Sequence, residues 1–203
     1  MEFSDVIRKR RMARAFTTEP VDPAVTERIL RAANRAPSAG FSQGYALLVL
    51  DQPDQLASFW ELVGPSDDDD EEDRARFAAV SKAPLVVVPL SCKDIYLDRY
   101  ARADKGWTDK DEAHWPVPYW DIDTGFLALL MLLAAVDEGL GALFFGITPE
   151  LMGDFRALFG VPAQYVPIGA VAIGHHDQAA DLGGSARVIK RRELSDLVHR
   201  GRW

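Results

Sequence analysis

The sequence has a single cysteine, Cys92, among its 203 residues. One thiol cannot form a disulfide within the chain, and it is too few for a cysteine-based metal cluster. A scarcity of cysteine is typical of proteins from a reducing compartment. The first residues are charged from Glu2 onward and have no apolar core like that of a signal peptide. We therefore expect a cytoplasmic protein.

Basic residues are also fewer than acidic residues. The chain carries 23 lysines and arginines against 31 acidic residues, which gives a formal net charge of −8. This excess of negative charge argues against a general nucleic-acid or anionic-membrane surface, so an anion would have to be bound by a local basic cluster. The four histidines lack the spacing of a metal site, and we expect no bound metal.

A hydrophobic run long enough to cross a bilayer is missing too. The most apolar stretch, residues 124–136, is well short of the ~20 residues required, and acidic side chains lie close to both of its ends. A helix over residues 124–138 would be apolar all round, so we predict a core helix buried on every side. Asp123 and Thr124 can cap its first turn, and Gly139 can end it.

The rest of the pattern predicts an α+β fold in one domain, residues 1–203. Two amphipathic helices come first, the second with Asp22 as its cap. Strands are predicted over residues 46–50, 83–90 and 166–173, and a further helix over residues 149–159. Residues 83–90 are apolar without alternation, which is typical of an inner strand covered on both faces. Residues 142–146 should lie beside the core helix.

Two segments have a composition suited to ligand binding. Residues 8–11 are all basic and Arg14 follows them, so they could clamp a phosphate with planar guanidinium groups. The alternative is a solvated helix end whose cations complement the helix dipole. Apart from Pro37 and Phe41, residues 36–44 are small, hydroxyl or amide residues that would let a flat ligand approach the backbone, or else form a plain turn between helix and strand.

Two further segments are unusual in composition. Residues 67–73 are all acidic, which favours a solvated helix start or loop over a calcium loop, because the alternating ligands and turn glycine of a calcium loop are missing. Residues 93–120 are rich in aromatic side chains and poorly periodic, which is typical of a lid or an interface. Aromatic rings there could stack on a planar substrate or simply fill the core.

Five segments, in this order, resemble the nitroreductase-like family of FMN-dependent oxidoreductases. They are residues 10–16 (RRMARAF), residues 36–44 (APSAGFSQG), residues 139–146 (GLGALFFG), the strand that ends at Ile173 and Gly174, and the basic group at residues 190–192. The match spans most of the chain. It implies a central, mostly antiparallel sheet flanked by helices, and a homodimer with two FMN sites at its interface.

The resemblance also implies which residues hold FMN. The phosphate and ribityl side would be contacted by Arg10, Arg11, Met12 and Arg14, together with Lys190, Arg191 and Arg192. The flavin ring would be approached by one segment of the same subunit and by one loop of the partner subunit. These are, respectively, Leu143, Phe144, Phe145 and Gly146, and Pro37, Ser38, Ala39, Gly40 and Phe41.

Three positions depart from the family pattern. Met12 stands where a serine is common, so one phosphate contact is absent from the set. Phe41 stands where an asparagine is common, and Phe145 stands where some relatives carry an acidic residue. That acid is linked with positioning water or nicotinamide, so Phe145 weakens the expectation of the usual quinone or nitro reduction.

The activity that the resemblance implies is a ping-pong transfer of hydride from NAD(P)H through the flavin to a flat acceptor, such as a nitroaromatic or a quinone. The flavin carries the chemistry, so no catalytic side chain is expected. Trp107, Tyr119 and Trp120 would shape the substrate end of the pocket. The alternatives are a specialised enzyme of the same fold (an oxidase, dehalogenase, flavin-fragmenting or deazaflavin-linked enzyme) and a non-catalytic FMN-binding protein.

Overall fold

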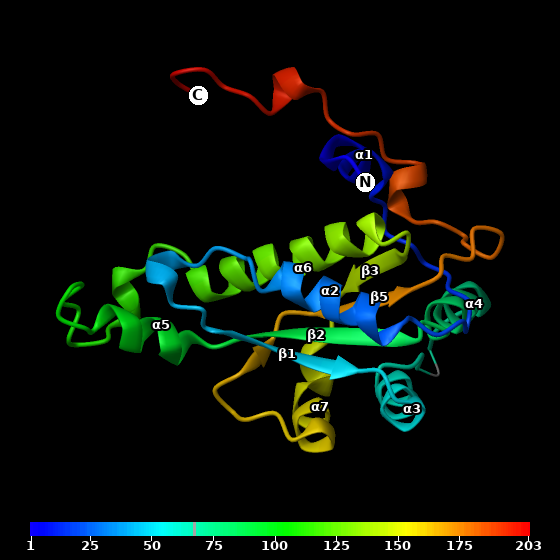
Figure 1. The fold of residues 1–203 in the computed structure, drawn as a ribbon, viewed down its shortest axis with the longest axis horizontal. Helices are drawn as coiled ribbons and strands as arrows, with labels where there is room; N and C mark the ends of the chain where they lie inside the picture. Colours follow the sequence, from blue (N-terminus) through cyan, green and yellow to red (C-terminus); the bar gives the residue numbers. More distant parts are fainter. Residues whose placement is uncertain (67) are drawn as a thin grey trace.

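The computed structural model describes residues 1–66 and 68–203 of the chain. Its helices are α1 (Phe3–Lys9), α2 (Pro23–Ala33), α3 (Pro53–Leu62), α4 (Glu71–Val80), α5 (Lys93–Tyr100), α6 (Tyr119–Asp137) and α7 (Met152–Phe159). Its strands are β1 (Tyr45–Leu50), β2 (Leu85–Ser91), β3 (Gly141–Phe145), β4 (Val166–Pro167) and β5 (Ala170–Gly174). Short 3₁₀ turns lie between them, and the last residues of the chain extend past α1, away from the body (Figure 1).

The strands form one antiparallel sheet in the order β1-β2-β5-β3, with the short β4 paired to β2. β2 is hydrogen-bonded along both edges, to β1 and to β5. Every residue of β2 is buried. The predicted inner strand and the predicted antiparallel sheet are therefore both confirmed.

The apolar run of β2 serves two cores, because successive side chains of a strand point to opposite faces. Leu85 and Val87 pack with α2 and α6, whereas Val86 and Val88 pack with α3 and α7. Helices thus cover both faces of the sheet (Figure 1). An inner strand covered on both faces needs no polar side, which explains why its sequence does not alternate.

The core helix differs from its prediction at its start and on its outer face. It begins at Tyr119, behind Pro118, and not at Asp123 and Thr124. These two side chains lie inside the helix, where Thr124 Oγ1 donates to the carbonyl of Trp120 at 2.6 Å. Burial on every side was also wrong, because Ile122, Phe126 and Leu129 are 37%, 43% and 45% exposed.

Among the helices of the described residues, only α6 is long and apolar enough to cross a membrane. Half of its most apolar window is buried inside the protein. Leu127, Met131 and Ala135 of α6 pack with Val87 and Val171 of the sheet in one core cluster. These contacts are those of a core helix, as predicted from its length.

Three smaller differences concern single segments of the chain. The predicted strand 166–173 is split into β4 and β5 around Gly169, whose φ of 149° breaks the ladder. Residues 141–145 form a strand that was not predicted, and helix α5 occupies part of the aromatic segment 93–120. The acidic run does start a helix, with Asp70 as the cap of α4, but its first residue, Asp67, lies outside the described residues.

Replacing Met131 by alanine tests the α6 core. Met131 is fully buried against the sheet, so Met131→Ala should lower the free energy of unfolding by about 2–5 kcal/mol, through lost burial and a residual cavity. Leu158→Ala on α7 is the matched control, because Leu158 is 48% exposed and should cost about 0.5 kcal/mol or less. Urea denaturation measures both. Equal losses in the two variants would contradict this account of the core.

Candidate cofactor site

The segment after α1 is fastened along β3. The amide of Ala13 donates to the carbonyl of Ala142 at 3.0 Å, and Met12 forms a parallel bridge with Ala142. A Cβ added at Gly141 would lie 2.8 Å from the Cβ of Ala13, so only glycine permits this approach. The short contact places residues 10–14 beside the edge of the sheet.

A basic cavity of about 450 Å³ lies at this edge. Five guanidinium groups line it, together with Met12, His176 and small residues of the segment after β5; they belong to Arg10, Arg11, Arg14, Arg187 and Arg191. Within the described residues, none of these five guanidiniums lies within 4 Å of a carboxylate, whereas Arg28, Arg76 and Arg99 are all paired. Cations that converge without counter-ions make an anion-binding site.

Asp181 lines this cavity, and hydrogen bonds to its carboxylate hold the loop after β5 in place. Its carboxylate accepts from the amides of Arg14 at 2.9 Å and Gly183 at 2.6 Å, and it contacts His176 Nε2 at 2.7 Å. Burial raises the pKa of this carboxyl, but the hydrogen bonds from Arg14, His176 and Gly183 outweigh burial and hold the pKa below its usual value. The charge of Asp181 is thus used by two backbone amides and a histidine. The guanidiniums of Arg14 and Arg187 donate only to backbone carbonyls, those of Met12 at 3.3 Å and Asp181 at 2.7 Å, and keep no carboxylate partner among the described residues.

A second, mainly apolar cavity of about 290 Å³ adjoins the first through Arg14, which lines both. Its walls include Leu143, Phe145 and Gly146 from β3 and the residue after it. The Phe145 ring stacks on Trp60 with a centroid distance of 5.8 Å and an interplanar angle of 14°. Arg76 also lines this cavity, where it pairs with Glu72 and donates to the carbonyl of Gly183 at 2.8 Å.

The structure therefore brings together eight of the predicted cofactor residues. Arg10, Arg11, Met12, Arg14 and Arg191 line the basic cavity, and Leu143, Phe145 and Gly146 line the apolar one. Three neighbours do not line either cavity. Phe144 points to the opposite face of the sheet, and Arg192 donates to the carbonyl of Asp196, while Lys190 lies exposed on the tail.

Two other predicted groups lie at the opposite end of the molecule, beside α5 (Figure 1). Gly40 and Phe41 line a cavity of about 590 Å³ with residues of α5. Pro37, Ser38 and Ala39 precede them in the same loop. Trp107, Tyr119 and Trp120 all contact the Trp115 ring, at centroid distances of 5.5, 5.6 and 6.1 Å. Within one chain, neither group meets the basic cavity.

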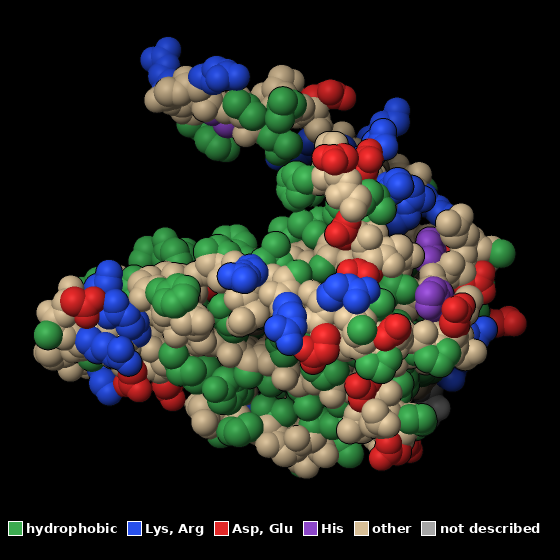
Figure 2. Space-filling model, in the orientation of Figure 1, with side chains coloured by type: hydrophobic (Ala, Val, Ile, Leu, Met, Phe, Trp, Pro, Cys, Tyr) green, Lys and Arg blue, Asp and Glu red, His purple; other side chains and the backbone are tan. Residues whose placement is uncertain are grey.

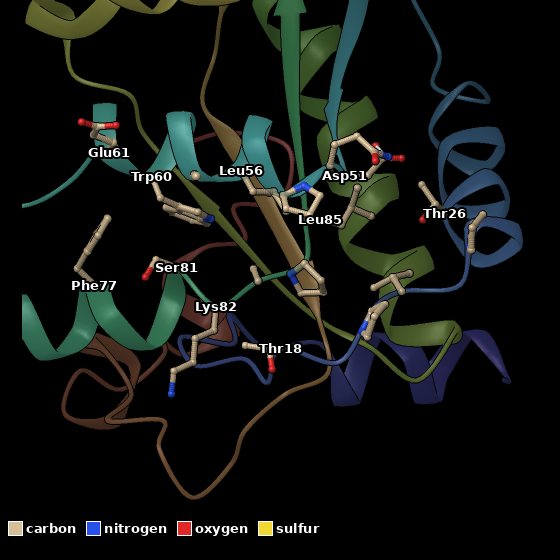
Figure 3. Close-up of a pocket in the computed structure, with 18 residues that line it drawn as sticks. Thr18, Thr26, Asp51, Leu56, Trp60, Glu61, Phe77, Ser81, Lys82 and Leu85 are labelled. Atoms are coloured by element: carbon tan, nitrogen blue, oxygen red, sulfur yellow. Dashed lines mark hydrogen bonds between the residues drawn. The ribbon is translucent and has the colours of Figure 1, made fainter.

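A larger cavity of about 920 Å³ shares two walls, Trp60 and Phe77, with the apolar one. The other residues that line it lie between 18 and 26, between 51 and 61 and between 81 and 85 (Figure 3). Its lining includes none of the predicted site residues. Size alone therefore does not identify the site, because the convergent cations lie elsewhere.

Several lining residues escaped prediction from the sequence. They are Arg76, His176, Asp181, Gly183, Gly184 and Arg187. The residues after Gly174 have no periodic pattern, although the Gly183-Gly184 pair is a usable signal. A Cβ at Gly184 would lie 2.5 Å from Cζ of Arg14, and one at Gly183 would lie 2.0 Å from Nε of Arg187. Gly183 also has φ of 74°, which disfavours a side chain, and at Gly184 a Cβ would require the Arg14 side chain to move.

An antiparallel sheet between two helical layers, with a cationic cavity beside an apolar one, defines a protein that binds a flat ligand with an anionic tail. The nitroreductase family model matches residues 7–175, and the chain belongs to this family. A protein of Archaeoglobus fulgidus with the provisional name NADH dehydrogenase/NAD(P)H nitroreductase is 26% identical over 200 residues, which are 98% of this chain and 97% of the relative.

Solved structures have the same fold. A nitroreductase family protein from Streptococcus pneumoniae superposes with a TM-score of 0.72 at 19% identity, covering 98% of this chain and all of the other. A provisionally named nitroreductase from Desulfovibrio desulfuricans, crystallised with FMN, gives a TM-score of 0.67 at 22% identity, over 98% of this chain and 95% of the other. The predicted family and fold are confirmed.

Asp181→Asn tests the role of the buried acid through pH. A carboxyl whose folded pKa is lowered stabilises the fold above its unfolded pKa, about 3.8, and this contribution is lost as pH falls through the folded pKa. The Tm of Asp181→Asn should lie below that of the wild type at pH 6, and the gap should narrow towards about pH 3. Asp154→Asn, an exposed carboxylate on α7, is the control. A gap that does not change with pH would contradict the assignment.

Proposed function

We propose that this protein is an FMN-dependent oxidoreductase that moves hydride from NADH or NADPH to a flat acceptor such as a nitroaromatic or a quinone. One observation carries the proposal: five guanidiniums without carboxylate partners converge on a cavity that adjoins an apolar cavity. FMN has the matching form, a phosphate dianion joined through a ribityl chain to a flat ring. Family membership and the FMN complex of a relative support the same cofactor.

The basic cavity fits the phosphate. Arg10, Arg11, Arg187 and Arg191 would hold it, because guanidinium forks match phosphate oxygens and stay charged at any working pH. The serine common at the position of Met12 is absent, and Arg187, which was not predicted, supplies a further donor. The acidic chain thus gathers five guanidiniums without carboxylate partners at one cavity, where an anion would be strongly held.

The apolar cavity fits the ring. Leu143, Phe145 and Gly146 would lie against it, and Arg14, between the two cavities, would reach both ends of the cofactor. When bound, FMN accepts and donates hydride at its ring, so the protein supplies binding, orientation and exclusion of water. The described residues that line this cavity include no carboxylate and no imidazole. The donor and the acceptor would use the same open side of the pocket in turn.

A second copy of the chain would complete the site. The loop at residues 37–41 and the aromatic group around Trp115 lie far from the basic cavity of their own chain (Figure 1). Ile122, Phe126 and Leu129 form an exposed apolar face on α6, where Figure 2 shows hydrophobic side chains along one edge of the body. Such a face is suited to a subunit interface. We therefore propose a homodimer in which each loop reaches the partner's flavin.

Replacing Arg10 by alanine tests the phosphate site. The variant should bind FMN about 10-fold or more weakly, since a hydrogen bond to a charged group contributes about 1.5–3 kcal/mol. Riboflavin, which lacks the phosphate, should bind wild type and variant equally. Arg31→Ala, at an exposed position of α2, is the control and should change neither affinity. Flavin fluorescence titration measures the affinity of each of the three proteins for each of the two flavins. An equal loss for riboflavin would place Arg10 at the ring or in the fold, not at the phosphate.

The visible spectrum of the purified protein tests the activity. A flavin spectrum that bleaches on anaerobic addition of NADH or NADPH, and returns on addition of a quinone, is the expected result. A flavin that neither nicotinamide reduces would favour a specialised enzyme with another donor, and a flavin that a deazaflavin donor also fails to reduce would favour a non-catalytic flavin protein. A protein that binds no FMN would overturn the cofactor assignment.

A further inference from the structure

The loop between α2 and β1 is held in a strained conformation. Gly40 has φ of 60°, and two residues with side chains, Phe41 and Gln43, have φ of 53° and 52°. Side chains disfavour the left-handed region, so such residues persist only where their surroundings fix them. Two sets of contacts fix this loop, one from α6 and one from α5.

The first contact comes from the core helix. Asp123 of α6 is 3% exposed, and one of its carboxylate oxygens accepts from the amide of Ala39 at 2.8 Å and from the hydroxyl of Tyr96 at 2.7 Å. Burial and the nearby Asp123 raise the pKa of Tyr96, so its hydroxyl remains a donor. Asp123 is therefore a buried acceptor for a loop 84 residues away in the sequence.

The second contact comes from α5. Arg99 Nε donates to the carbonyl of Gly40 at 2.9 Å, while both terminal nitrogens of Arg99 bind Asp104, at 2.9 and 2.7 Å. The Tyr100 ring covers Gly40 so closely that a Cβ there would lie 2.6 Å from it. Tyr100 in turn packs on Trp107 and Trp115, at centroid distances of 4.8 and 4.5 Å. The aromatic segment thus supports the loop from behind.

With the loop held by these contacts, the aromatic ring of Phe41 is left exposed. Phe41 is 73% exposed although the residues on both sides of it are hydrogen-bonded in place. An apolar ring that a strained backbone holds outward buries little of its surface within its own chain. It is suited to contact a flat ligand or another subunit, since its position is fixed before binding.

We propose that Asp123 and Arg99 are positioning residues that hold the 37–43 loop, and that Phe41, so presented, selects flat aromatic acceptors in the flavin pocket of a second copy. This inference rests on the proposed function. It gives the aromatic segment 93–120 a supporting role in place of a closing one. It also gives a reason for an apolar residue at position 41, where relatives commonly carry asparagine.

A pair of variants separates the loop contact from general stability. Asp123→Leu removes the acceptor for both Ala39 and Tyr96 and keeps a side chain that branches at Cγ, whereas Tyr96→Phe removes only the Tyr96 hydrogen bond and leaves the Ala39 amide bound. Asp123→Asn keeps an oxygen acceptor and serves as the conservative rescue. All are compared with wild type as FMN-loaded protein, by amide exchange of residues 39–43, visible circular dichroism of the flavin and the KM for menadione.

The expected result is specific to Asp123→Leu. Amide exchange of the loop should speed up at least 10-fold, the visible dichroism should change and the KM should rise severalfold, while Tyr96→Phe and Asp123→Asn stay close to wild type. Arg99→Gln should act in the same direction. Equal changes in Asp123→Leu and Tyr96→Phe, or a fall in Tm with no change in flavin dichroism, would overturn the positioning role. If Asp123→Leu does not fold, Arg99→Gln decides by the same readouts.

Phe41→Ala tests the presented residue itself. Because Phe41 is exposed, its removal should leave Tm and loop exchange unchanged, yet raise the KM for menadione severalfold and leave the KM for ferricyanide, a small non-planar acceptor, unaltered. Equal effects on both acceptors, or on neither, would overturn the selection role while FMN binding and reduction by nicotinamide still stood. Absence of FMN binding in the wild type would overturn the proposed function and this inference together.

Discussion

The coverage of β2 on both faces is the constraint on which the rest of the structure depends. A strand whose residues are all buried needs a helical layer on each side, and α6 supplies most of one layer. Because α6 must cover this face of the sheet, its length and direction are fixed. The position of β3 follows, since β3 comes directly after α6 and pairs antiparallel with β5. β3 then offers its edge to the N-terminal segment, through the close contact of Gly141 with Ala13. The arginines are thus placed by packing that begins in the middle of the sheet.

The electrostatic arrangement follows from this placement. An acidic protein has carboxylates in excess, and Arg8, Arg28, Arg31, Arg76 and Arg99 each pair with one. The five arginines of the basic cavity do not, because the acid in their midst, Asp181, is occupied by two amides and His176. Like charges that converge without a counter-ion repel one another, so the fold sustains them at some cost in stability. The cost is understandable if an anion completes the site.

Much of the fold could be predicted from the sequence, because its main signals are local. The apolar run of β2, the cap at Asp22 and the apolar length of α6 each depend on neighbours in the chain. Asp123 shows the limit of this reasoning. Read locally it is a helix cap, yet its donors are Ala39 and Tyr96, which only the tertiary structure brings near.

The candidate site shows the same division between local and distant signals. Residues 143–146 were predicted as one set, but a strand sends alternate side chains to opposite faces. Leu143 and Phe145 therefore line the apolar cavity while Phe144 joins the other core. Arg187 and the Gly183-Gly184 pair were missed because their segment has no periodic pattern. Their role follows only from the crossing of Arg14 and Arg187 over the glycines.

The strained loop and the basic cavity pose one geometric problem together. A compact chain could bring its flat-ligand residues to one place, yet here the 37–43 loop and the cavity lie at opposite ends of the body. Strain at the loop is maintained by a buried carboxylate, an arginine and an aromatic cluster. Strained residues persist only where the surrounding structure fixes them, and such sites are commonly functional. The proposed two-fold pairing across the apolar face of α6 would resolve the problem, since an isologous interface makes each chain supply to its partner what it receives.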